Sequence, residues 1–101
     1  MRLKTVWSLE AISEFEIFYN YWIEKNGSDT YSKKIWYRIN KAVEIIEVNP
    51  KLGIPTNHSD IKMRLILSNH YLIYKIRKES IEILKFWDVR QNPHKNRYTP
   101  K

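Results

Sequence analysis

The sequence predicts a small α+β domain, in which an N-terminal strand and a helical hairpin precede a three-stranded antiparallel meander. Apolar residues recur at helical spacing between residues 11 and 46. Three short runs rich in Ile, Leu, Tyr, Phe and Trp follow residue 60, and brief polar breaks separate them. We therefore expect the helices to pack on one face of the sheet. The 101 residues suit a single domain, residues 1–101.

The N-terminal half carries clear helix boundaries. RLKTVW, residues 2–7, is typical of a short strand, and Ser8 is a good N-cap for the helix that follows. Asn26-Gly27 ends this helix, Ser28 or Asp29 begins a second one, and Asn49-Pro50 ends that one. The apolar stripes of the two helices are Ala11 or Ile12, Phe15, Phe18 or Tyr19 and Trp22, and then Tyr31, Ile35, Ile39, Ala42 or Val43 and Ile46.

The C-terminal half is predicted to form a loop followed by strands. KLGIPTNHSD, residues 51–60, contains the Gly and Pro of a loop. The strands are expected at residues 61–68, 71–77 and 81–88, with a two-residue turn at Asn69-His70 and a similar one at Glu79-Ser80. From about residue 89 the chain is expected to be irregular.

A turn at Asn69-His70 fixes which side chains share a face of the sheet, because strand residues alternate between faces. One face is then apolar and packs on the helices, with pairs Leu67–Leu72, Leu65–Tyr74 and Met63–Ile76. The other face gathers four cations and Tyr71, with pairs Ser68–Tyr71, Ile66–Ile73, Arg64–Lys75 and Lys62–Arg77. A similar turn at Glu79-Ser80 adds residues of the last strand and its continuation to this second face, namely Glu82, Leu84, Phe86, Asp88 and Arg90. Like charges opposite each other destabilise a sheet, so this cluster favours an anionic ligand. A register slip of one residue would invert the assignment.

The net charge of +7 is unevenly placed. Residues 1–50 carry seven Lys or Arg and seven Asp or Glu, whereas residues 51–101 carry eleven and four, so the whole excess of 11 − 4 lies in the second half. A one-sided basic field attracts nucleic acid or an acidic protein partner. Most acidic residues of the first half fall on the helices, where we expect them on the solvent faces.

Several classes of protein are disfavoured. The chain has no cysteine, its N-terminus is too polar for a signal peptide, and its apolar runs are too short to span a bilayer, so we expect a cytoplasmic protein. No phosphate-binding glycine loop is present, and His58, His70 and His94 lack metal-ligand spacing, so we expect neither a metal nor a small-molecule cofactor. The side chains that are left as candidates for chemistry are those of Arg, Lys, Tyr and His, and these residue types permit metal-free cleavage of RNA.

The order of these segments resembles the RelE/ParE toxin superfamily, and most closely its plasmid-stabilisation branch. The segments that carry the resemblance are AISEFEIFYNYW, NPKLGIP, MRLILSNHYLIYKI and IEILKFWDVRQNP, and together they extend it from about residue 5 to residue 93. The resemblance implies a toxin of a bacterial type II toxin–antitoxin module, held inactive by a cognate antitoxin. RelE-like members cleave mRNA in the ribosomal A site without metal, whereas ParE-like members poison DNA gyrase and have no nuclease activity.

The resemblance also assigns residues one by one. Lys62 and Arg64 match basic positions on the strand after the second helix, and Tyr71 stands where the RelE pattern has an arginine. Arg90 matches a basic position after the last strand. Tyr98 matches a C-terminal tyrosine, and His94 stands near the place where some relatives use a histidine.

These residues favour, by a small margin, a ribosome-dependent mRNA endonuclease. In that hypothesis Arg64 and Arg90 stabilise the phosphate, while Tyr71, His94 or Tyr98 transfers protons. Lys62, Lys75 and Arg77 join Arg64 and Arg90 in binding RNA. The alternative is a gyrase inhibitor that acts by protein binding, and a third hypothesis is a basic nucleic-acid-binding module outside any toxin system. Trp36 and Tyr37, which lie off the apolar stripe, are candidate antitoxin contacts.

Overall fold

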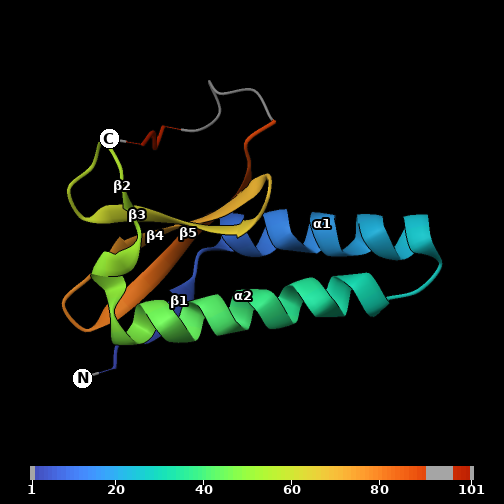
Figure 1. Cartoon of the computed structure of the whole chain (residues 1–101), viewed down its shortest axis with the longest axis horizontal. Helices are drawn as coiled ribbons and strands as arrows, with labels where there is room; N and C mark the ends of the chain where they lie inside the picture. Colours follow the sequence, from blue (N-terminus) through green and yellow to red (C-terminus); the bar gives the residue numbers. More distant parts are fainter. Residues whose placement is uncertain (1, 91–96, 101) are drawn as a thin grey trace.

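In a computed structural model, which describes residues 2–90 and 97–100, two helices pack on one face of a five-stranded sheet (Figure 1). This confirms the predicted α+β class. In Figure 1 the two helices run side by side, and the turn that joins them lies beyond the sheet. The elements are β1 (Lys4–Trp7), α1 (Leu9–Asn26), α2 (Thr30–Val48), the 3-10 turn η1 (Pro50–Leu52), β2 (Ile54–Pro55), β3 (Ile61–Leu67), β4 (His70–Ile76) and β5 (Ser80–Asp88).

The helix ends lie where the sequence predicts them. Ser8 caps α1, and its hydroxyl oxygen accepts a hydrogen bond of 3.0 Å from the amide of Ala11. Gly27 ends α1 in the left-handed region with φ of 71°, which glycine adopts without steric cost. Asp29 precedes α2, although its side chain makes no capping hydrogen bond, and Pro50 begins η1 directly after the helix.

The sheet has the order β1-β5-β4-β3-β2. β1 pairs in parallel with β5, so the first and last strands of the chain are neighbours, and the other pairs are antiparallel. β2 was not predicted, because it falls in the segment expected to be a loop. Its two residues include Pro55 and are too few to show a periodic pattern.

Apolar side chains form two clusters, one on each face of the sheet. The helix-facing cluster joins both helices to Leu72, Tyr74, Ile81, Ile83 and Phe86. The outer cluster comprises Ile61, Met63, Ile73 and Trp87, with Tyr71, Leu84 and Tyr98 at its margin, and no helix residue belongs to it. The sheet therefore buries apolar residues on both faces.

The predicted register of β3 and β4 was wrong. Leu67 pairs with His70, so the turn is at Ser68-Asn69, and a bulge between Leu65 and Leu67 shifts the pairing further. Arg64 consequently lies opposite Leu72, not Lys75, and Met63 lies opposite Ile73. The reason lies in β4, whose residues 71–74 are apolar on both faces, so the alternation does not fix the register.

A second bulge changes the face of Phe86. The pairing of β4 with β5 shifts between Ile73 and Tyr74, after which Leu72 pairs with Phe86. Phe86 therefore points toward the helices, where its ring packs edge-on against Phe15 and Phe18 at 5.4 and 5.2 Å between centroids. The sequence had placed Phe86 on the opposite face, because strict alternation along β5 does not allow for a bulge.

Candidate functional site

The four cations predicted to form one face do not share a face. Lys62 and Arg64 pair with Tyr74 and Leu72, which belong to the helix-facing cluster, so these two cations project from the helix side of β3. Lys75 pairs with Ile61, a member of the outer cluster, and so lies on the other side. The predicted arrangement is therefore wrong. The observed pairing of β3 with β4 differs from the predicted pairing by an odd number of residues, and such a shift moves side chains to the opposite face of the sheet.

Lys75 and Arg77 are also engaged by acidic neighbours. The amine of Lys75 lies 3.6 Å from a carboxylate oxygen of Asp60. Arg77, which follows β4, donates hydrogen bonds of 2.5 and 3.2 Å to Glu82, and Glu82 is the cross-strand neighbour of Lys75. Charge balance on the outer face explains these two cations without a ligand.

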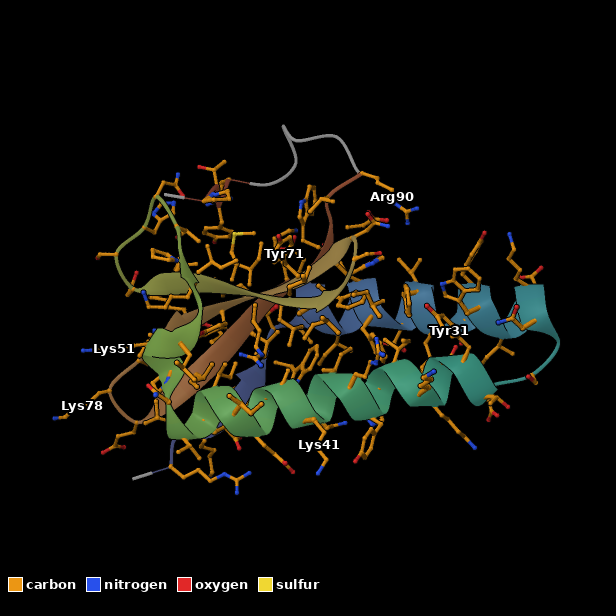
Figure 2. All side chains as sticks on the ribbon, in the orientation of Figure 1. Tyr31, Lys41, Lys51, Tyr71, Lys78 and Arg90 are labelled. Carbon is orange, nitrogen blue, oxygen red and sulfur yellow. The ribbon has the colours of Figure 1, made fainter. Side chains whose placement is uncertain are left out.

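The predicted proton-transfer residues lie apart from Arg64. Tyr71 borders the outer cluster, on the side of the sheet opposite the helices (Figure 2). Tyr98 reaches the same cluster from the C-terminal segment. Residues near β2 hold this segment in place: Thr56 forms a β-bridge with Pro100, and the amide of Asn57 donates a hydrogen bond of 2.9 Å to the Thr99 carbonyl. His94 lies outside the described residues.

Arg90 follows β5 and is held by Asp88. Its guanidinium donates two hydrogen bonds, of 3.1 and 3.0 Å, to the two carboxylate oxygens of Asp88. The hydrogen bond from Arg90 is the main reason that the pKa of Asp88 lies below its ordinary value, and the pKa of Arg90 is raised by the same contact. Arg90 projects past the end of the sheet in Figure 2.

A groove of about 1120 Å³ lies between α1, the start of α2 and the strand ends near the Ser68-Asn69 turn. Its walls combine aromatic rings with charges of both signs. Phe18, Tyr21, Trp22 and Tyr31 contribute the rings, whereas the charged side chains are Glu10, Glu14, Lys25, Arg38, Lys85, Asp88 and Arg90. Such a mixture suits contact with a protein segment, because aromatic residues and arginine are enriched at protein interfaces.

Sequence reasoning missed the ion cluster that fastens α1 to β5. Lys85 is buried and its amine donates to Glu10 and to Glu14, the latter at 2.9 Å. The other oxygen of Glu14 accepts a hydrogen bond of 3.0 Å from the amide of Phe86. Burial opposes the charge on Lys85, but its hydrogen bonds to the two carboxylates outweigh this and raise its pKa. The available signal was the i, i+4 spacing of Glu10 and Glu14, which puts both on one side of α1.

His70, which the sequence treated only as part of a turn, is buried at the groove. Its ring stacks on Phe86 at 4.8 Å and meets Phe18 edge-on at 5.1 Å, and its Nε2 atom lies 3.7 Å from Asp88. Burial lowers the pKa of His70 from the ordinary 6.5, while Asp88 opposes the shift and Arg90 adds to it.

We expect this protein to lose stability as the pH falls from about 7 to about 5. The unfolded chain protonates His70 before the folded chain does, so acid favours unfolding in this window. Asp88 and Glu47 lie outside the window, because their pKa values are lowered from 3.8 and 4.5. Urea unfolding at stepped pH measures the effect. His70→Phe should flatten the profile, and an unchanged slope in His70→Phe would contradict the assignment.

Among the described helices, none is long and apolar enough to cross a membrane. No group of three or more His, Asp or Glu side chains is placed to hold a metal ion within residues 2–90 and 97–100. Trp36 and Tyr37 are exposed on α2, and Trp36 packs against Phe15 and Trp7 beside a smaller apolar groove between the helices.

Comparison with known structures shows which solved proteins share this fold. A ParDE toxin–antitoxin system from P. aeruginosa matches with a TM-score of 0.71 at 16% identity, over 88% of this chain and 98% of that chain. The YoeB dimer from Staphylococcus aureus matches with a TM-score of 0.62, and a YoeB–YefM complex from the same organism with 0.58; each is 22% identical over 85% of this chain and 95% of the other. The fold is that of small toxins of toxin–antitoxin systems.

The family follows from the sequence match. A model of the ParE toxin family, described as the ParE toxin of the type II toxin–antitoxin system parDE, matches residues 5–93. The chain belongs to this family, which confirms the predicted superfamily. A search of curated proteins found no match. Two of the similar structures contain toxin–antitoxin assemblies.

Proposed function

We propose that this toxin acts in the cytoplasm by binding a protein target, DNA gyrase, and that it does not cleave mRNA. The sequence favoured the opposite order of these two hypotheses by a small margin. The observation that reverses the order is the separation of the side chains that RNA cleavage would use. Lys62 and Arg64 lie on the helix side of the sheet, whereas Tyr71 and Tyr98 lie against the outer cluster.

Cleavage by attack of the ribose 2′-hydroxyl needs its groups together. A proton-transfer residue must lie within hydrogen-bond reach of the reacting oxygen while cations contact the same phosphate. A sheet that buries apolar residues on both faces separates Arg64 from both tyrosines. Arg90 is already held bidentately by Asp88, so it has an intramolecular carboxylate where a phosphate would bind.

Two further observations support a protein-binding toxin. The matching family is named for ParE toxins, and the resemblance seen in the sequence associates ParE-like members with gyrase. The large groove offers aromatic and paired charged groups, and the exposed Trp36 and Tyr37 lie on α2. Aromatic anchors with paired charges at their margin are the usual components of a protein interface.

The proposal is tested with gyrase and with ribosomes in parallel. Purified toxin should inhibit supercoiling by gyrase or trap DNA breaks, and primer extension on mRNA in a translation extract should show no codon-linked cleavage. The double variant Arg64→Ala with Tyr71→Phe should still arrest growth, because neither side chain performs chemistry. Circular dichroism of this variant controls for folding. Codon-linked breaks that disappear in the folded double variant would overturn the proposal in favour of the endonuclease.

A further inference from the structure

We propose that an exposed face of α2 binds the phosphate backbone of double-stranded DNA. The face comprises Lys34, Tyr37, Arg38 and Lys41, all of them exposed, and we call it the basic face of α2. In Figure 2 the labelled Lys41 lies on the side of α2 that is remote from the sheet. This inference goes beyond the proposed function, because it gives the toxin a second ligand, and it does not depend on gyrase as the target.

The helical hairpin separates charges that balance in the sequence. Residues 1–50 carry seven Lys or Arg and seven Asp or Glu. In the structure α1 contains four glutamates and one lysine, whereas α2 contains four cations, and its two glutamates both follow Lys41. Only Lys33 among these cations has a close acidic partner before that point, since it lies 3.1 Å from Asp29. A polyanion is therefore attracted to α2 and not to α1, which fixes its orientation.

The cations of the basic face are not compensated. Lys34 and Arg38 form no ion pair and no side-chain hydrogen bond within the parts of the chain that the structure describes. Lys41 lies 3.7 Å from Glu44, but both side chains are exposed and such a contact contributes little. Lys34 and Arg38 are four residues apart and Arg38 and Lys41 are three apart, so like charges are neighbours on the helix surface, which destabilises a helix. This arrangement favours an anionic ligand.

The spacing of these cations suits a DNA duplex. Seven residues of helix separate Lys34 from Lys41 and rise about 10.5 Å. The major groove of B-DNA is about 12 Å wide, so the two ends of the face can contact phosphates of the two strands that border it. Lysine is depleted from protein interfaces, whereas lysine and arginine commonly bind phosphate oxygens. Tyr37 lies between the cations, and its exposed hydroxyl can donate a further hydrogen bond to a phosphate.

DNA and a protein target need not compete for α2. Successive helix residues are about 100° apart, which places Trp36 and Arg38 on opposite flanks. The structure agrees, because Trp36 borders the smaller apolar groove and Arg38 borders the larger groove. A protein can therefore contact Trp36 while the duplex contacts the basic face.

The test uses a fluorescein-labelled duplex of about 20 base pairs and the full-length toxin, without gyrase. Fluorescence anisotropy should show binding that weakens as salt is raised, because phosphate contacts release counterions. The variant Lys34→Gln with Arg38→Gln and Lys41→Gln should bind about tenfold or more weakly at low salt. It should also reduce the slope of log affinity against log salt by about three, one for each cation.

The matched control is Lys4→Gln with Lys51→Gln and Lys78→Gln, which loses the same charge at exposed positions outside α2. We expect it to change the slope by less than about one. Circular dichroism of both variants controls for folding.

Three outcomes would overturn the proposal. Absence of binding by the wild-type toxin at low salt would remove its basis. Equal losses of slope in both triple variants would mean that net charge alone attracts DNA. Equal binding of double-stranded RNA of the same sequence would mean that α2 does not enter the groove, since the major groove of RNA is too narrow. Because gyrase is absent from this assay, its failure leaves the gyrase proposal standing, and failure of the gyrase assay leaves this proposal standing.

Discussion

Replacing Phe86 by alanine should lower the free energy of unfolding by about 3–5 kcal/mol, the range for removing a buried aromatic ring. Phe86 is 4% exposed, and its ring contacts those of Phe15, Phe18 and His70. It therefore joins α1 to the start of β4, and its removal leaves a cavity among these rings. Urea unfolding of the purified variant at constant pH measures the loss.

Leu65→Ala is the matched control, because the predicted and the observed registers exchange these two residues. The sequence places Leu65 beneath the helices and Phe86 on the open face, whereas Leu65 is 50% exposed in the structure. We expect Leu65→Ala to change stability by less than about 1 kcal/mol. A large loss for Leu65→Ala together with a small loss for Phe86→Ala would restore the register that strict alternation predicts.

Replacing Lys85 by methionine should have the second-largest effect, a loss of about 2–4 kcal/mol. Methionine fills a similar volume but leaves Glu10 and Glu14 facing each other without a cation. Removing one partner of a buried ion pair leaves the other charge buried without a counter-ion, which costs stability. The side chain of Glu10 is 64% exposed, so water will reduce this loss of stability. Thermal and urea unfolding measure the loss, which should appear as a clear drop in melting temperature.

Two companion variants identify the cause of that loss. Glu14→Gln added to Lys85→Met removes one stranded charge and keeps an oxygen for the Phe86 amide, so it should restore part of the stability. Lys78→Met, in the exposed turn before β5, should be neutral to within about 0.5 kcal/mol. If Lys85→Met is as harmless as Lys78→Met, the ion cluster does not hold α1 against the sheet.

The candidate site was less predictable than the fold. The sequence identifies Lys62, Arg64 and Arg90 as notable cations, but whether they meet depends on how two hairpins pair. The alternation along β3 is clear, whereas β4 is apolar on both faces and accepts either register. The ion cluster at Lys85 joins residues more than 70 positions apart, as Glu10 and Glu14 bond across the fold. No local pattern reports such a contact.

The sequence by itself determined the class of fold, the ends of both helices and the toxin family, because caps, Gly27, Pro50 and the apolar periods are local signals that act within a few residues. Only the tertiary structure decided which face each cation occupies. Two bulges and a turn one residue earlier than expected move side chains to the face opposite the predicted one. This register is the one in which Leu72, Tyr74 and Phe86 fill the space between the sheet and the helices. Packing of residues distant in the chain, and not strand alternation, fixed the surface that partners meet.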